Sequence, residues 1–283
     1  MTPYLLTVFA MLAFAANSVL GRLALVVNGN EASIDAASYT SIRLTSGALM
    51  LALILVIRTR ELKIKNINPV STAMLFAYAI CFSFSYIHIA TGTGALILFG
   101  AVQLTMILSG LLKGERPGYL ALAGILLAFG GLVYLLLPGI SAPPLASAML
   151  MMIAGIAWGI YSLRGKGTAN PLVATSWNFI GTLPLVLLSY LLFHADAHLT
   201  LKGITLAIVS GALASGLGYA IWYSALPHLT ATRAATVQLT VPIIAAIGGV
   251  LFLAEPVSLR LALASITVLG GVYLTIKPEK KVN

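Results

Sequence analysis

Charged residues and cysteine are scarce in this sequence. Of its 283 residues, 8% are Asp, Glu, Lys or Arg and 60% are hydrophobic, and the mean hydropathy is +1.02. A soluble domain carries about 25% charged residues, so this composition excludes a soluble fold, and it also excludes disorder, which needs low hydrophobicity. The single cysteine, Cys81, excludes an internal disulfide and a metal site built on paired cysteines. We therefore expect an integral membrane protein.

Basic residues are also too sparse for a nucleic-acid-binding surface. The net charge is +9, but the 16 Lys and Arg are spread over the whole chain. They form no dense basic stripe with aromatic residues between them, which nucleic-acid binding requires. We therefore expect the lipid bilayer, and no nucleic acid, as the surroundings of this chain.

Long stretches without Asp, Glu, Lys or Arg predict ten membrane-spanning helices. A helix needs about 20 apolar residues to cross the hydrocarbon. Two stretches are each long enough for two spans with a turn between them, namely 66–112 and 117–163. Single spans fit six others, namely 4–27, 38–57, 171–193, 203–226, 230–254 and 258–276. Because the apolar runs do not alternate as β-barrel strands do, we expect an all-α integral membrane fold.

The basic residues predict the orientation of the chain. With ten spans, both termini lie on the same side of the membrane. If that side is the cytoplasm, only Lys202 and Arg260 fall in outer loops, and Arg22 and Arg43 lie toward the outer ends of spans one and two. The other twelve Lys and Arg then face the cytoplasm, as the positive-inside rule favours. We expect a multi-pass protein with both termini cytoplasmic.

Two motifs recur at the same separation and predict an internal repeat. Glu115 in Lys-Gly-Glu-Arg-Pro-Gly and Glu255 in Leu-Ala-Glu-Pro-Val-Ser are 140 residues apart, as are the Gly-Gly pairs 130–131 and 270–271. We expect one transmembrane domain made of two five-helix repeats, residues 1–140 and 141–283. Because five is odd, the second repeat enters the membrane inverted, which places a binding site between the halves.

Ten spans, the paired motifs at Glu115 and Glu255, and a Trp-Gly pair at Trp158 resemble the EamA branch of the drug/metabolite transporter superfamily. Within it, the chain is most similar to exporters of aromatic and other neutral amino acids in the bacterial inner membrane. The resemblance implies a secondary transporter that exports a small molecule by alternating access and needs no cofactor. A general metabolite or drug exporter on the same scaffold is the alternative. The sequence leaves the oligomeric state open, a monomer included.

Aromatic and amide side chains inside the spans are the candidates for binding substrate. Tyr78 and Phe82 lie at helical spacing with Ser85 on nearly the same face. An amide facing lipid would lack hydrogen-bond partners, so each amide faces the bundle, either bonding a neighbouring helix or facing substrate. The substrate-binding candidates are Tyr78, Trp158, Trp177, Gln238, Asn17, Gln103, Phe82, Ser85 and Tyr219.

Three further pairs of residues have two interpretations each. Arg22 and Arg43 either extend to the lipid headgroups or contact a substrate carboxylate. Pro184 and Pro242 are either hinges or tolerated kinks. We expect Glu115 and Glu255 to cap the N-termini of spans five and ten rather than to take part in transport.

The predicted spans contain no Asp or Glu near the membrane midplane. Proton-driven carriers commonly place such a group there, so we expect transport without obligatory proton coupling. His88 is the one candidate against this, because a His side chain changes its charge near neutral pH. The missing carboxylate pair also argues against an intramembrane enzyme. His194 and His198 have the spacing of zinc ligands, but they flank Asp196 in an outer loop, so we expect no metal site.

Overall fold

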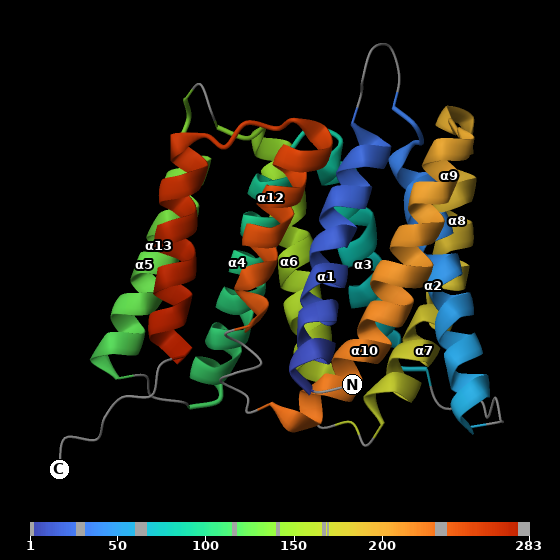
Figure 1. Ribbon diagram of the computed structural model, residues 1–283, viewed down its shortest axis with the longest axis horizontal. Helices are drawn as coiled ribbons and strands as arrows, with labels where there is room; N and C mark the ends of the chain where they lie inside the picture. The colour runs from blue at the N-terminus through green and yellow to red at the C-terminus, as the bar shows by residue number, and fades with distance from the viewer. Residues whose placement is uncertain are drawn as a thin grey trace.

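The computed structural model describes residues 3–26, 32–59, 67–114, 118–139, 142–165, 168, 170–229 and 237–276. It is a bundle of roughly parallel helices (Figure 1), and the described residues form no strand. Eight helical stretches are long and apolar enough to cross a membrane, and two shorter apolar helices accompany them. The predicted all-α membrane fold with ten helices is confirmed.

The helices follow the predicted spans closely. They are α1 (Pro3–Leu25), α2 (Ala36–Thr59), α3 (Pro69–Tyr86), α4 (Thr91–Leu112), α5 (Tyr119–Leu136), α6 (Leu145–Gly165), α7 (Pro171–Gly181), α8 (Leu183–Phe193), α9 (Leu201–Ile208), α10 (Gly218–Ala225), α12 (Thr240–Leu253) and α13 (Leu259–Ile276). Together α7 and α8 make one span, and α9 and α10 make another with the π-helix η2 (Val209–Leu217) between them. Short 3-10 turns, η1 (His194–Asp196) and η3 (Leu226–His228), follow α8 and α10.

Side-chain caps explain where several helices begin. The Asn68 side chain accepts a hydrogen bond from the Ser71 amide at 3.0 Å, directly before Pro69. Asn170 accepts from the Val173 amide in the same way, directly before Pro171. An Asn at the cap satisfies a free amide, and a proline at the first helical position loses no helical hydrogen bond. The sequence thus sets the starts of α3 and α7 locally.

Small residues allow the closest helix contacts. Helices α5 and α13 pack together at one end of the bundle (Figure 1), where a Cβ atom on Gly124 would lie 2.5 Å from the Gly271 carbonyl oxygen. Helix α6 packs against both α3 and α4, and a Cβ on Gly155 would lie 2.6 Å from the Leu98 carbonyl oxygen. Since packing drives helix association in lipid, these glycines set the distances between the helices.

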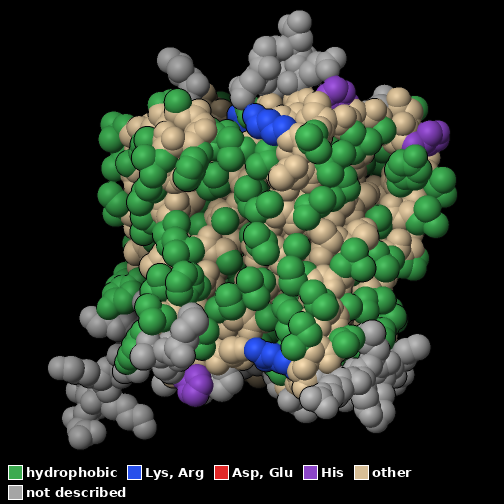
Figure 2. Space-filling view, turned by 45° about the vertical axis from the view of Figure 1, so that its right-hand side comes forward, with side chains coloured by type: hydrophobic (Ala, Val, Ile, Leu, Met, Phe, Trp, Pro, Cys, Tyr) green, Lys and Arg blue, Asp and Glu red, His purple; other side chains and the backbone are tan. Residues whose placement is uncertain are grey.

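The outside of the bundle suits a bilayer. Figure 2 shows hydrophobic side chains over the middle of the visible face, with Lys, Arg and His side chains of the described residues near its two rims. On α5, Leu126 is 64% and Phe129 is 59% exposed. Such exposure of large apolar side chains is stable in hydrocarbon and marks a membrane surface rather than a soluble one.

The π-helix η2 lies between α9 and α10, where this span packs against α2. A Cβ on Gly211 would collide with the Arg43 carbonyl oxygen and the Ser46 hydroxyl of α2. Gly211 therefore allows this span to approach α2 closely. π-Helical segments inside α-helices are frequent at functional sites, and two serines of this one bond Asn17 at the centre of the bundle.

Candidate functional site

The centre of the bundle holds a column of aromatic side chains. On α3, the ring centroids of Tyr78 and Phe82 are 5.6 Å apart. Trp158 on α6 lies 4.9 Å from Tyr78 and stacks on Tyr219 of α10 at 5.2 Å. Four candidate residues from both halves of the chain therefore meet at one place.

A cavity of about 20 Å³ lies beside this column. Asn17 of α1 lines it together with Tyr78, Phe82, Trp158 and Tyr219, so five of the nine substrate-binding candidates surround one space. The remaining lining residues, which the sequence interpretation missed, are Phe14, Ser18, Leu98 and Phe99. The spacing of Phe14 and Ser18 on the face of α1 that carries Asn17 could have indicated them. A space of this size holds about one water molecule, so the centre is closed in this conformation.

Asn17 also joins two spans. It is 3% exposed, and its Oδ1 accepts hydrogen bonds from the hydroxyls of Ser210 at 2.8 Å and Ser215 at 3.1 Å. Both serines belong to η2. The two interpretations of this amide are therefore compatible, because it bonds a neighbouring helix and lines the central cavity.

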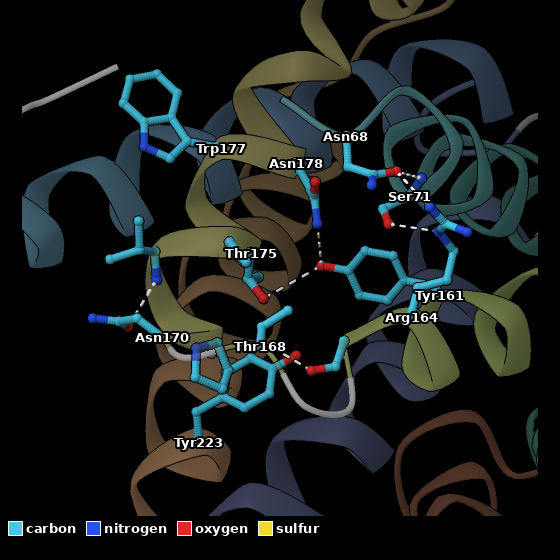
Figure 3. A pocket seen from close by; sticks show the side chains of 14 residues that line it. Asn68, Ser71, Tyr161, Arg164, Thr168, Asn170, Thr175, Trp177, Asn178 and Tyr223 are labelled. Atoms are coloured by element: carbon cyan, nitrogen blue, oxygen red, sulfur yellow. Dashed lines mark hydrogen bonds between the residues drawn. The ribbon is translucent and has the colours of Figure 1, made fainter. Parts of the chain in front are cut away.

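A second, larger cavity of about 340 Å³ opens at the lower face of the bundle as drawn in Figure 1, between the end of α6 and the start of α7. In Figure 3, Tyr161, Thr175 and Asn178 point toward one another. The Tyr161 hydroxyl donates to Thr175 Oγ1 at 3.3 Å and accepts from Asn178 Nδ2 at 3.4 Å. Because Tyr161 stacks on Trp158 at 5.3 Å, it connects this cavity to the aromatic column.

One cation lies at the mouth of the larger cavity. Arg164, in the last turn of α6, donates to the Ser71 hydroxyl at 3.3 Å and to Asn68 Oδ1 at 3.2 Å. Figure 3 shows these three side chains together at one edge of the cavity. Trp177, the one substrate-binding candidate that lines this cavity, points away from Tyr161.

Three substrate-binding candidates lie away from both cavities. The Ser85 hydroxyl donates to the Ser147 carbonyl at 2.7 Å and so joins α3 to α6. Gln103 is 4% exposed on α4, and Gln238 is half-buried directly before α12. None of the three lines the cavity beside the column or the one at the lower face.

The two candidate hinge prolines lie at helix starts. Pro184 is in the first turn of α8, after the break at Thr182 between α7 and α8. Pro242 is in the first turn of α12, where the helix has no intrahelical acceptor for the missing N–H. The Thr240 hydroxyl donates to the Val237 carbonyl at 2.6 Å.

Arg43 is buried in the bundle and does not reach a headgroup. It is 2% exposed, its Nη2 donates to the Tyr78 hydroxyl at 2.9 Å, and its Nε donates to the Ser215 hydroxyl at 3.4 Å. The guanidinium carbon lies 5.3 Å from the Tyr78 ring centroid and 4.7 Å from that of Phe82. Of the two interpretations of Arg43, extension to the headgroups is wrong, because its hydrogen-bond partners lie inside the bundle.

Arg22 is held at the opposite face, away from the larger cavity. Its Nε donates to Glu255 Oε1 at 3.1 Å, the one ion pair among the described residues. Its Nη1 donates to the Tyr86 and Ile87 carbonyls at 2.8 and 2.7 Å. These bonds replace the headgroup contact that we considered for Arg22.

The carboxylate of Glu255 has a different role from the one expected. Its Oε2 accepts from the Thr91 amide at 2.7 Å, so it caps α4 rather than the tenth span. The sequence position predicts a cap for the helix that directly follows Glu255. The observed partners, Arg22 and Thr91, are more than a hundred residues away from it in the sequence. The corresponding cap at Glu115 falls outside the described residues.

The sequence pattern of the EamA-like transporter family matches residues 145–277. An uncharacterized protein of Pseudomonas aeruginosa is 53% identical over 275 residues, which cover 97% of this chain and 94% of that one. An uncharacterized transporter of Archaeoglobus fulgidus is 30% identical over 65% of this chain and 67% of its own length.

Two further similarities are more distant. A protein of Salmonella typhimurium named a probable amino-acid metabolite efflux pump is 27% identical over 64% of this chain and 66% of its own length. One crystal structure of a protein with 17% identity aligns over 96% of both chains with a TM-score of 0.68. At that identity the structural similarity shows the fold alone.

Proposed function

Since the chain belongs to the EamA-like transporter family and is therefore a secondary transporter rather than an enzyme, we propose that it exports aromatic and other neutral amino acids or similar small metabolites. The observation that carries this proposal is the aromatic column beside the central cavity, with Tyr78 and Trp158 at its middle. Ligand sites of this kind are mostly apolar and aromatic with a few placed polar groups. The distant relative named as an amino-acid metabolite efflux pump supports the substrate class.

The two faces of the bundle support export by alternating access. At one face Arg22 and Glu255 join α1, α3 and α4 to the segment after α12. At the other face a cavity of about 340 Å³ leads to Tyr161 and the aromatic column. In the orientation proposed from the basic residues, that open face is cytoplasmic. In this conformation the protein then takes up substrate from the cytoplasm, for export across the inner membrane of the cell.

The contacts between helices support two inverted repeats, residues 1–140 and 141–283. Helix α3 packs against α6, and the corresponding span of the second repeat, α9 to α10, packs against α1. Helix α5 packs against its counterpart α13, and α4 against α12. The family pattern also matches within the second repeat alone. A two-fold axis in the membrane plane would relate these contacts.

Transport that follows the substrate gradient without obligatory proton coupling is part of the proposal. Among the described acidic side chains, Glu255 is bonded to Arg22 and the Thr91 amide, and Asp35 accepts from the Ser38 and His198 amides. The central cavity is lined by aromatic, aliphatic, Asn and Ser side chains. A carrier coupled to protons needs a group whose protonation changes during the cycle, and these lining residues offer none.

The test is flux in proteoliposomes with a panel of labelled amino acids, each with and without an imposed pH gradient. We expect flux of aromatic and other neutral amino acids down their gradients, with equal final distribution under both conditions. Transport of non-amino-acid metabolites or drugs in place of every amino acid would favour the alternative, a general exporter. Empty liposomes and liposomes with heat-inactivated protein are the controls.

A further inference from the structure

We propose that Arg43 recognises the carboxylate of the substrate, so that the transporter selects small carboxylates carrying an apolar or aromatic group and does not require an amine. This inference rests on the proposed function, because it names the chemistry that the central site reads. It concerns one guanidinium beside Tyr78 and Phe82, near the centre of the bundle.

The hydrogen bonds of Arg43 are incomplete. Nη2 and Nε each donate to a neutral hydroxyl, those of Tyr78 and Ser215, whereas Nη1 is buried with no hydrogen-bond partner. A buried cation without an anion is costly, and contact with the two aromatic faces offsets only part of that cost. The planar guanidinium is suited to bind a carboxylate with two parallel hydrogen bonds.

No described acidic side chain contacts Arg43. Asp35 accepts from the Ser38 amide at the start of α2, and Glu255 is paired with Arg22. Asp196 lies in the turn after α8. The predicted spans likewise contain no Asp or Glu near their middles. The one cation at the centre is therefore not balanced by the described part of the chain, and an incoming anion would balance it.

The position of Arg43 fits a substrate that arrives from the larger cavity. That cavity reaches Tyr161, which stacks on Trp158, and Trp158 contacts Tyr78, whose hydroxyl accepts from Arg43. A carboxylate that replaced this hydroxyl as the acceptor would exchange a neutral hydrogen bond for a charge-assisted one. Because the central cavity holds only about 20 Å³, the aromatic side chains must move apart as the substrate enters.

Because no described acidic side chain contacts Arg43, the central site also offers no carboxylate to bind a substrate ammonium group. A substrate ammonium group would need an anionic or several neutral acceptors, and the Asn17 oxygen, the amide acceptor lining the cavity, already accepts two hydroxyls. A monoanion neutralises Arg43, whereas a zwitterion leaves the centre with the same net charge. We therefore expect that an N-acylated amino acid is accepted at least as well as the free amino acid.

The test compares the transport of three related compounds in proteoliposomes: phenylalanine, N-acetylphenylalanine and phenylalaninamide. For the parent protein we expect transport of the first two and about tenfold to hundredfold weaker transport of the amide, as the loss of a charge-assisted hydrogen bond predicts. Arg43→Gln should remove this preference for the acid forms, and Arg43→Lys should keep part of it. Arg260→Gln, at the start of α13 and hydrogen-bonded to Leu137, is the matched control and should behave as the parent.

The outcomes separate the two proposals. Equal transport of the amide and the acid by the parent, or an unchanged preference in Arg43→Gln, overturns the role of Arg43 and leaves amino-acid export standing. Transport of none of the three compounds by folded parent protein overturns both. Because equal transport of the amide and the acid by the parent would by itself overturn the inference, it stays testable even where Arg43→Gln does not fold.

Discussion

Arg22 and Arg43 lie inside the first and second spans, and their surroundings differ. Arg22 is 14% exposed at its side chain and meets a carboxylate and two backbone carbonyls. Arg43 is 2% exposed and meets two hydroxyls and two aromatic faces. The first has anionic and carbonyl acceptors within the protein, and the second has only neutral ones.

This difference indicates two roles: Arg22 holds a conformation, whereas Arg43 is available to bind a ligand. The pair of Arg22 with Glu255 joins residues 233 positions apart in the sequence, so in the proposed transport cycle it must break before that face of the bundle opens. Arg43 lies beside Tyr78 and Phe82 of the central column, and its unbonded Nη1 can donate to a new partner without breaking an ion pair. Interactions that are complete stabilise a state, whereas incomplete ones are available to substrate.

The largest effect that tests this comparison is on stability. Glu255→Ala leaves the Arg22 cation without its anion and the Thr91 amide without its acceptor. We expect a loss of about 2–3 kcal/mol in the free energy of unfolding, somewhat below the value for a fully buried pair because both side chains keep some exposure. Thermal unfolding of detergent-solubilised protein, read by size-exclusion chromatography, measures it.

The control for this prediction neutralises both partners together. The double variant Arg22→Gln with Glu255→Gln should recover part of the lost stability, because no unpaired charge remains. If Glu255→Ala unfolds at the parent temperature, the pair does not hold the closed face, and the contrast with Arg43 fails.

The next effect is on transport and concerns the central aromatic column. Trp158→Ala removes the ring that stacks on Tyr219 and Tyr161 and lines the central cavity. We expect flux to fall about tenfold or more, in keeping with the cost of removing an aromatic contact with substrate. Initial rates in proteoliposomes, corrected for the amount of folded protein, measure this.

A matched aromatic outside the column provides the control. Tyr119 at the start of α5 is 94% exposed, so Tyr119→Ala should leave flux unchanged. Equal flux in Trp158→Ala and the parent would remove the column from the substrate path.

What the sequence could predict was local. The ten helices follow from the length of apolar stretches, and the shared face of Tyr78 and Phe82 follows from helical periodicity. These signals lie within one helix and need no knowledge of the packing. Predicting the aromatic column required one further assumption, that aromatic side chains near the middle of a span face the inside of the bundle.

The remaining features depend on partners far away in the sequence. The burial of Arg43 depends on Tyr78 of α3 and Ser215 of η2, and nothing in the neighbouring sequence distinguishes it from an arginine that extends to lipid. The role of Glu255 likewise depends on Arg22 and Thr91. A residue near a helix start suggests a cap for that helix, and only the folded chain shows that it caps another.

The smallest expected effect concerns protons, at a residue outside both arginine sites. His88 is exposed after α3, and its backbone amide donates to the Ser85 carbonyl at 3.1 Å. Neither of the two cavities along the proposed path is lined by its side chain. Because a group that couples protons to transport must change its protonation as the site opens and closes, we expect His88→Gln to transport as the parent does. The measurement is accumulation against a substrate gradient in liposomes under an imposed pH gradient, with Glu255→Gln tested beside it. Proton-driven accumulation that is lost in His88→Gln would refute transport without proton coupling. The same loss in Glu255→Gln alone would instead assign the coupling to the Arg22 pair, and the closed face would then be the proton-sensitive part of the molecule.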